Sequence, residues 1–446
     1  MGNRTSSDRA RCLVLLLALC LIPSVQAQQK EKPKLKNFGE SLKRIKWDPE
    51  KNAAVEVKSP RSSNASPAGD YDVVRVETSL VRSDLLVLDA RGNSVAGLTA
   101  KDFIVTEDGT AQQVGMFSLG DNVDVQRSIV LIIDYHEAQL PFLRSSVAAA
   151  KTLIDKLAPK DRMAIVTDDI ELLAGYSNNK QRLKDTLDEL GRRPSFDPQT
   201  FLERGSQVRF GRGFVYSALM AVLKEAFDEE DRRPIIIFQT DGEEAYLLKN
   251  PIVVASAPPG LPPDLAPLAE RFLERHRKFK ERNKREFSLN DVYQAAEKAR
   301  ATNYTVVPGY QLLGSSDKES IERMRAYEGT GVSYLGVATN HTADRLKRIP
   351  DEAIRFEAQQ KIKTQSALAV LSTITGGWIE FLNQPAQADE IYSRIFSDIN
   401  RRYLVGYYPT NKERDGKRRK VSISVREHPE YMVMGRKAYY APGAEQ

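Results

Sequence analysis

Two unbroken apolar segments, each closing on an aspartate, constrain the fold of this chain more than any other feature. Ser128–Asp134 reads Ser-Ile-Val-Leu-Ile-Ile-Asp, and Arg233–Gly242 reads Arg-Pro-Ile-Ile-Ile-Phe-Gln-Thr-Asp-Gly. A strand that is apolar at every position is buried on both faces, which is typical of a parallel sheet covered by helices. These segments therefore predict a buried parallel sheet at the centre of the chain.

The residues around these two segments alternate between strand and helix patterns. Further strands are expected at 161–167, 171–176, 302–308 and 378–382, and helices at 144–157, 183–190, 215–227 and 391–401. This alternation predicts an α/β domain over residues 123–401, with a mostly parallel sheet and helices on both faces. Two long segments interrupt the pattern, at 249–290 and 313–362, and are expected to be insertions.

Shorter strand patterns lie on either side of this domain, at 71–122 and 402–442. Asp108-Gly109 and Asp415-Gly416 are hairpin turn signals, and a final strand is expected over 431–440. Neither side has enough chain to close a sandwich alone. We therefore expect one small β-sandwich, built from both sides, with the α/β domain inserted in it.

The N-terminal region has the pattern of an export signal. Three arginines precede an apolar run of about eleven residues, shorter than the roughly 20 that span a bilayer. Residues 1–27 are predicted to be a signal peptide and 28–70 a flexible linker. Both cysteines, Cys12 and Cys20, fall inside the signal, so disulfides and cysteine chemistry are not expected in the exported chain.

Charge and hydropathy limit the partners. The net charge is +6, which the signal's three Arg and one Asp reduce to about +4 after cleavage, so nucleic-acid binding is not expected. No later segment is long and apolar enough to predict an integral membrane span. Arg271–Arg285 mixes basic, acidic and aromatic residues at helical spacing, which favours a solvated helix face over a site for an acidic partner.

The two aspartates are the main candidates for a functional site. Ligands of open parallel sheets bind outside the carboxyl ends of the strands, where strand order reverses. Asp134 and Asp241 both follow such strands. Converging carboxylates suit a hard divalent cation, because Mg²⁺ prefers oxygen ligands.

Over residues 71–442 the chain resembles the von Willebrand factor A (vWFA) domain, and more closely the vWFA-related bacterial proteins common in acidobacteria. The motifs are Leu98-Thr-Ala-Lys-Asp-Phe103, Glu107-Asp-Gly109, Leu131-Ile-Ile-Asp134, Leu157-Ala-Pro-Lys-Asp-Arg162, Gln239-Thr-Asp-Gly242, Ile374-Thr-Gly-Gly377, Tyr403-Leu-Val-Gly-Tyr-Tyr-Pro409 and Arg436-Lys-Ala-Tyr-Tyr-Ala-Pro442. The resemblance implies a Rossmann-like vWFA domain in an extracytoplasmic bacterial protein.

The resemblance also implies a metal-ion-dependent adhesion site, in which Asp-x-Ser-x-Ser, a Thr and a second Asp hold Mg²⁺ for an acidic group of a partner. Here His136 and Ala138 stand where the serines are expected, and Gly213 stands where the Thr is expected. Only the carboxylates Asp134 and Asp241 match. Three hydroxyl ligands are absent, and the site is degenerate.

Two interpretations of this site remain open. The aspartates form a residual cation site for Mg²⁺ or Mn²⁺, with His136 or Glu137 as a substitute ligand, or they are structural turn and capping residues. No cofactor is certain on this evidence. The surrounding loop positions expected to contact a ligand are Glu137, Gly211, Gly213 and Gly242. Asp168 and Asp169, after the second strand, are interpreted as solvated loop charges.

Catalytic patterns are weak. No nucleophile elbow, phosphate-binding glycine loop or dinucleotide fingerprint is present in the sequence. A phosphatase-like hydrolase with Asp134 as nucleophile is a remote alternative, because its second acid would fall at His136.

The expected function is therefore a non-catalytic, exported protein, periplasmic or extracellular, that binds a protein partner through the vWFA top face. A structural envelope scaffold with a vestigial site is the alternative.

Overall fold

A computed structural model describes ten stretches of the chain: residues 45–48, 53–56, 80–122, 125–136, 139–193, 213–227, 233–253, 256–263, 266–328 and 348–443. The predicted signal and most of the predicted linker lie outside them. Inside the linker range, strands β1 (Ile45–Asp48) and β2 (Ala53–Glu56) form an antiparallel pair. The sequence did not predict this pair. No helix within these stretches is both long and apolar enough to cross a bilayer.

The central sheet has six strands in the order β12-β11-β10-β7-β8-β9. They are β7 (Arg127–Ile133), β8 (Arg162–Thr167), β9 (Leu172–Ser177), β10 (Arg233–Gln239), β11 (Thr302–Pro308) and β12 (Ile379–Leu382). All pair in parallel except β9, which runs antiparallel to β8 at one edge. The mostly parallel sheet and its six predicted strands are confirmed.

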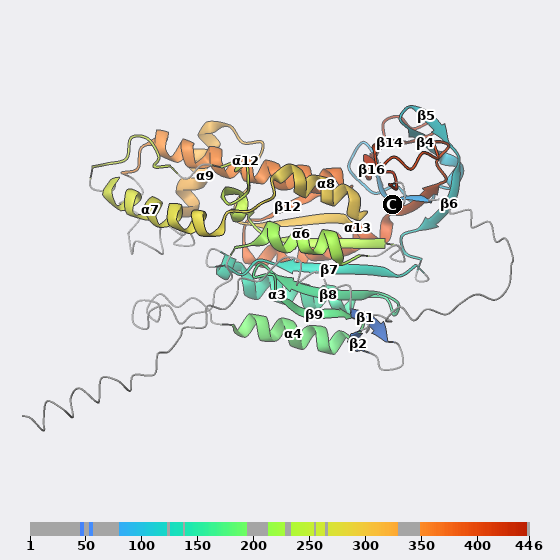
Figure 1. Cartoon of the computed structure of the whole chain (residues 1–446), viewed down its shortest axis with the longest axis horizontal. Coiled ribbons are helices and arrows are strands. Elements are labelled where there is room, and N and C mark those ends of the chain that lie inside the picture. Colours follow the sequence, from blue (N-terminus) through green and yellow to red (C-terminus); the bar gives the residue numbers. More distant parts are fainter. Residues whose placement is uncertain are drawn as a thin grey trace, which may run out of the picture. The chain divides into compact units, whose positions relative to one another are not determined.

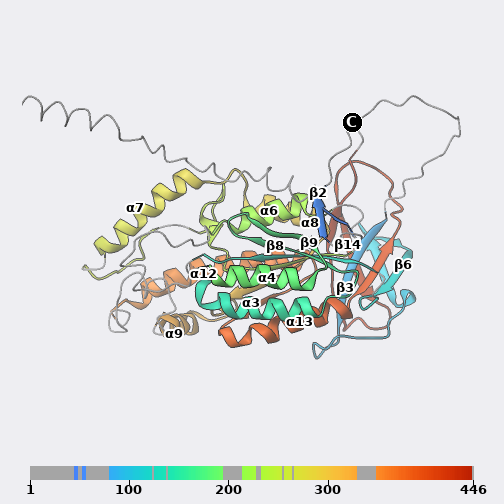
Figure 2. The same cartoon turned by 90° about the horizontal axis from the view of Figure 1, so that it is seen from below.

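Helices cover both faces of this sheet (Figures 1 and 2). One face carries α3 (Leu140–Asp155), α4 (Lys180–Arg192) and α13 (Ala388–Arg401), and the other carries α6 (Val215–Glu225), α8 (Leu289–Ala299) and α12 (Asp351–Ile374). Alternate residues of β7 enter opposite cores: Ile129 and Leu131 pack under α3, and Val130 and Ile132 pack under α6. The α/β class expected from the sequence is therefore the class observed.

The two predicted insertions are largely helical where they are described. Helix α7 (Ala266–Asn283) lies in the range 249–290, and α9 (Asp317–Glu328) lies in the range 313–362. Helix α12 also begins in the second range, and it packs against α9 through a small apolar core that includes Ile321, Met324 and Ile354. The second half of α12, which contains Leu368 and Leu371, covers the sheet.

A β-sandwich combines strands from both sides of the α/β domain, as expected. Its sheets have the orders β15-β3-β13-β6 and β16-β14-β4-β5. The strands are β3 (Val81–Leu88), β4 (Phe103–Glu107), β5 (Thr110–Gln112), β6 (Val114–Leu119), β13 (Tyr403–Tyr407), β14 (Arg418–Val425), β15 (Met432–Met434) and β16 (Ala438–Tyr440). N-terminal β3 pairs with C-terminal β13, and β4 pairs with β14. The core between the sheets includes Leu85, Phe103 and Tyr403.

One predicted hairpin is confirmed and one is wrong. Asp108 and Gly109 both have positive φ and join the paired strands β4 and β5, as their turn signal predicted. The segment around Asp415-Gly416 instead crosses between the sheets, because β13 and β14 lie in different sheets. The final strand expected over 431–440 likewise divides into β15 and β16, one in each sheet.

Two buried arginines tie the sandwich to the α/β domain. Arg233, at the start of β10, is 1% exposed and donates to Gly120 O at 2.6 Å, Ile399 O at 2.7 Å and the Asp84 carboxylate at 3.1 and 3.2 Å. Arg402 donates to the backbone oxygen of Asp84 at 2.9 Å and to the Tyr304 hydroxyl at 2.8 Å. Both guanidinium groups therefore hold β3 against the central sheet.

Replacing Arg233 with methionine is expected to lower the free energy of unfolding by about 3 kcal/mol, because Asp84 and two carbonyl groups lose their buried partner. Urea unfolding of the purified chain measures this change. Arg401→Met is the matched control, since Arg401 is exposed and donates to Ser94. Its effect should stay within about 0.5 kcal/mol. Equal effects of the two substitutions would contradict the role of Arg233.

Candidate functional site

Asp134 and Asp241 meet at the carboxyl edge of the sheet, as the sequence predicted. They follow the adjacent parallel strands β7 and β10, and the amide of Asp134 donates to Gln239 O at 3.0 Å. Strand order reverses between these two strands, which is where open α/β sheets bind ligands. Asp134 is fully buried, and the side chain of Asp241 is 27% exposed.

The ring of His136 lies among the carboxylates of this edge. Its Nδ1 is 2.6 Å from Asp134 Oδ1, and its Nε2 is 2.5 Å from Glu243 Oε2 and 3.9 Å from Asp241 Oδ2. The Nε2 contact with Glu243 lacks the alignment of a hydrogen bond, and it is an ion pair when the ring is protonated. Ligand atoms of Asp134, His136 and Asp241 all lie within 4.8 Å of one another. The predicted trio is therefore brought together.

The remaining carboxylate oxygens already accept hydrogen bonds. The Thr240 hydroxyl donates to Asp134 Oδ2 at 2.8 Å. Asp241 accepts at Oδ2 from the Gln139 amide, at 2.8 Å, and at Oδ1 from the backbone of Glu243, at 3.1 Å. Gln139, Thr240 and Glu243 were not among the residues predicted from the sequence. Glu243 could have been found, because it lies two residues after Asp241 on the same loop.

Asp168 was interpreted as a solvated loop charge, and this interpretation is wrong. The residue is fully buried after β8 and accepts from the backbone amides of Tyr135 at 3.2 Å and Gly213 at 2.7 Å. It thereby fixes the loops after β7 and before α6 against each other. Asp169 is half-buried and accepts from the Tyr135 hydroxyl at 2.7 Å.

The carboxylates and His136 perturb one another electrostatically. Burial raises the pKa of Asp168 well above its ordinary value, and the charges of Asp134 and Asp169 add to the effect. Burial also raises the pKa of Asp241, to about 6, against the opposing effect of His136. Burial alone would lower the pKa of His136, but the charges of Asp134, Glu243 and Asp241 hold that pKa well above its ordinary value.

The other predicted ligand-contact positions divide into two groups. Gly213 and Gly242 lie at the site with φ of +66° and +76°, and the nearest atom to a Cβ built on Gly213 would be His136 Cγ at 3.9 Å. Both glycines therefore form the left-handed turns of the site loops. Glu137 and Gly211 lie outside the described residues.

The Mg²⁺ site implied by the resemblance does not fit this donor set. Mg²⁺ requires near-octahedral oxygen ligands at about 2.1 Å. The hydroxyl positions expected in the two loops are His136, Ala138 and Gly213. The space between Asp134 and Glu243 holds the imidazole ring, whose nitrogens already lie at hydrogen-bonding distances from both carboxylates. A cation held by both aspartates would need this ring to move aside or to act as a ligand itself.

The first insertion is attached directly to this edge of the sheet. Arg285 forms an ion pair with the buried Glu244 at 2.5 Å and stacks over the Phe214 ring at 4.0 Å. Phe279 of α7 also packs against Phe214, with ring centroids 6.3 Å apart. Glu244 follows Glu243 in the short 3-10 helix η4 (Glu243–Tyr246). Helix α7 is therefore anchored beside the site.

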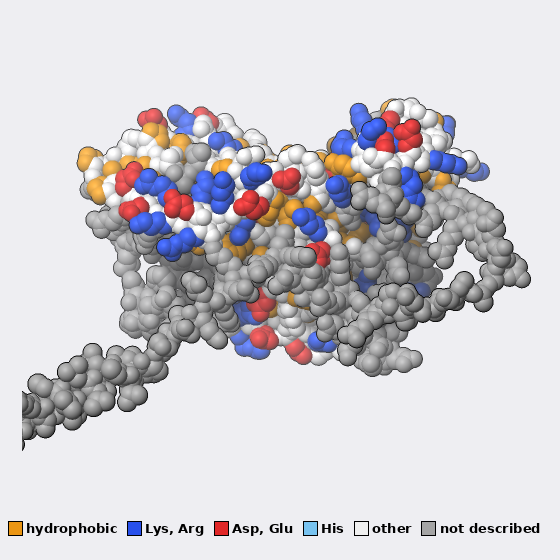
Figure 3. Space-filling model, in the orientation of Figure 1, with side chains coloured by type: hydrophobic (Ala, Val, Ile, Leu, Met, Phe, Trp, Pro, Cys, Tyr) orange, Lys and Arg blue, Asp and Glu red, His pale blue; other side chains and the backbone are white. Residues whose placement is uncertain are grey.

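The surface of α7 carries charges of both signs. Figure 3 shows basic and acidic side chains interleaved over this region. Arg277 pairs with Glu270 at 3.6 Å, and Lys278 pairs with Glu274 at 2.7 Å. This arrangement agrees with the solvated helix face expected from the sequence.

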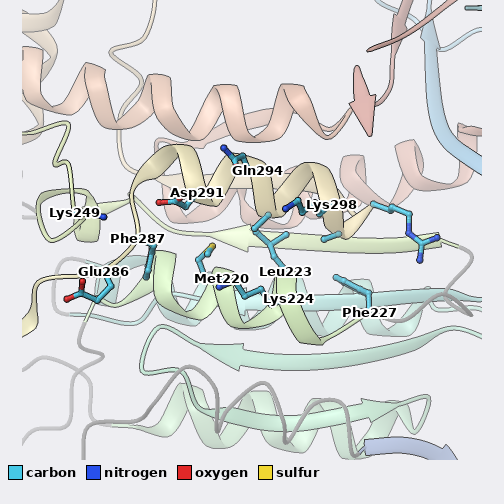
Figure 4. Close-up of a pocket in the computed structure, with 13 residues that line it drawn as sticks. Met220, Leu223, Lys224, Phe227, Lys249, Glu286, Phe287, Asp291, Gln294 and Lys298 are labelled. Atoms are coloured by element: carbon cyan, nitrogen blue, oxygen red, sulfur yellow. The ribbon is translucent and has the colours of Figure 1, made fainter. Parts of the chain in front are cut away.

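A separate groove of about 620 Å³ lies between α6 and α8 (Figure 4). Met220 and Leu223 of α6 reach into it, and Lys224, Lys249 and Lys298 are among its polar lining residues. None of its lining residues belongs to the carboxylate cluster. The groove is therefore distinct from the candidate site.

No protein-family model and no curated protein matches the chain. Solved structures to which it is similar include the conserved hypothetical protein BatB from Bacteroides thetaiotaomicron, with 13% identity, a TM-score of 0.27 and coverage of 61% of this chain and 98% of that chain. The vWF domain of the type V pili tip protein Mfa5 from Porphyromonas gingivalis has 13% identity and a TM-score of 0.30, and the match covers 62% of this chain and 95% of that chain. The manganese-loaded Plasmodium vivax TRAP protein has 16% identity and a TM-score of 0.22, and the match covers 46% of this chain and 61% of that chain. Values this low carry no inference about function.

Substituting Gly213 with alanine is expected to destabilise the fold by about 1 kcal/mol, because a residue with a Cβ is strained at φ +66°. Gly191→Ala is the control, and its expected effect on stability has the opposite sign. Gly191 lies in α4, and its new Cβ would meet Val147 at 3.6 Å, an ordinary contact. It should stabilise by up to about 1 kcal/mol. Thermal unfolding of both variants measures the two changes in stability. A stabilising effect of Gly213→Ala would contradict the left-handed turn assigned to Gly213.

Proposed function

We propose that this chain is a non-catalytic, exported bacterial protein of the vWFA-related type, and that it binds a protein partner at the carboxyl edge of its central sheet. One observation carries the proposal: Asp241 and Glu243 are partly exposed there, with side chains 27% and 43% accessible, above a buried base in which both oxygens of Asp134 are hydrogen-bonded. A rigid base with exposed charges is suited to recognition, because little order is lost on binding.

The hydrogen bonding of Asp134 favours binding over catalysis. A nucleophilic carboxylate needs an accessible oxygen, but Asp134 is fully buried and both of its oxygens are engaged, by His136 and Thr240. This arrangement argues against the phosphatase-like alternative. Partner contacts would come from the loops after β7 and β10, with the neighbouring helix α7 extending the surface.

Exposed apolar side chains on the β-sandwich favour the scaffold alternative. The β-sandwich exposes large apolar side chains at Leu119, Tyr408 and Met432, and Met432 is 61% exposed. Exposed apolar side chains mark a protein contact where they form a continuous patch, which is what this alternative requires of these three residues. Under this alternative the sandwich binds the partner, and the edge of the central sheet serves stability alone.

A comparison of two surface variants distinguishes binding at the sheet edge from binding by the sandwich. The immobilised full chain is exposed to an extract of the producing organism, and the retained proteins are cross-linked and identified. The double variant Asp241→Asn with Glu243→Gln should lose a partner that the wild type retains, by roughly tenfold or more, because a loss of 1.4 kcal/mol or more of binding free energy is a factor of ten or more.

The control is Leu119→Ser with Met432→Ser, which should retain that partner. The reverse pattern would support the scaffold and contradict binding at the sheet edge. Circular dichroism of each variant confirms that the fold is intact before the comparison.

A further inference from the structure

The carboxyl edge of the sheet concentrates negative charge in a small volume. Asp134 and Asp168 are fully buried there, and Asp241 and Glu243 are partly exposed. Buried carboxylates are costly unless a positive charge or several donors compensate them. His136 contacts three of these four carboxylates. Lys361 also acts on Asp241 through its charge.

The geometry of the His136 ring shows how this residue compensates the charges of the carboxylates. A neutral imidazole carries a proton on one nitrogen and a lone pair on the other. Here Nδ1 hydrogen-bonds with Asp134 Oδ1 at 2.6 Å, and Nε2 lies 2.5 Å from Glu243 Oε2 without the alignment of a hydrogen bond. A lone pair on Nδ1 would face the Asp134 oxygen and be repelled by it, and a neutral ring would bring no positive charge to the Glu243 oxygen. A ring protonated on both nitrogens is attracted to both carboxylates.

We infer that the imidazolium ring of His136 replaces the divalent cation at this edge, as an internal counter-ion that joins the loops after β7 and β10 without a metal. The same residue removes a hydroxyl from the position expected for a metal ligand and places a positive charge among the carboxylates. His136 is a positioning residue in this role, because it holds Asp134, Asp241 and Glu243 in place. The inference does not depend on the proposed partner binding.

The site therefore belongs to a different chemical class from a metal-bridged adhesion site. A bound Mg²⁺ would offer an open coordination position to an acidic group of a partner. Here the positive charge is enclosed, with 8% of the His136 side chain exposed, and the exposed groups are carboxylates. This last step rests on the proposed binding: a partner group that fits these carboxylates is a cation, such as a lysine or arginine side chain, and not a carboxylate.

The first test measures thermal unfolding of the full chain in EDTA and after adding Mg²⁺, Mn²⁺ or Zn²⁺. A ligand that binds only the native state raises the melting temperature. We expect no shift of the wild type beyond about 1 °C. A saturable shift that Asp241→Asn abolishes would overturn the inference, because it would show that a metal binds among these carboxylates.

The second test removes the ring. His136→Gln keeps a donor but not the charge, and we expect its melting temperature to fall by about 5 °C or more in EDTA. His136→Ser empties the same space and adds a hydroxyl ligand, so Mn²⁺ should recover part of its loss. An unchanged melting temperature for His136→Gln would contradict the counter-ion role. His428→Gln is the matched control, since His428 is exposed and contacts one carboxylate, Glu430.

A third measurement needs no variant and applies even if both His136 variants fail to fold. The ¹⁵N chemical shifts of the imidazole nitrogens in the labelled wild-type chain, assigned to His136, report whether each nitrogen carries a proton. We expect both to be protonated at neutral pH, with and without Mn²⁺. One unprotonated nitrogen would overturn the inference.

Discussion

Burying carboxylates at one edge of a parallel sheet creates a demand for positive charge and hydrogen-bond donors, and the loops at that edge supply both. The alignment of β7 beside β10 places Asp134 next to the loop of Asp241, and β8 adds Asp168. Without compensation, mutual repulsion and lost hydration would separate the loops. The His136 ring and donors from Gln139, Thr240 and the backbone hold them together.

The opposite edge of the sheet uses buried arginine instead. Arg233 begins β10 and Arg402 immediately precedes β13, and both donate to Asp84 of the sandwich. The inserted α/β domain is therefore joined to the sandwich near the points where the chain passes between them. The loops at the carboxyl edge are therefore not needed for this junction, and the small apolar core of α9 and α12 stabilises the second insertion separately.

The sequence predicted what depends on repeating patterns and missed what depends on pairing. Every strand of the central sheet was predicted, because continuous apolar runs such as 233–239 are unambiguous. The sandwich was predicted, but not that 431–440 divides between its two sheets, since strand pairing is set by distant partners. Asp134, His136 and Asp241 were identified together. The burial of Asp168 was not, because an acidic residue after a strand has the same local pattern whether it is solvated or bound to a neighbouring loop.

In this structure a protein side chain, and not a metal ion, joins the two aspartate loops. Crystals grown in Mn²⁺ and measured at its absorption edge test this most directly, because anomalous scattering locates manganese independently of any assumption about the site. We expect no anomalous peak between Asp134 and Asp241, and a His136 ring within hydrogen-bonding distance of Asp134 and Glu243. A manganese peak at bonding distance from both aspartates, with the ring displaced or acting as a ligand, would contradict it.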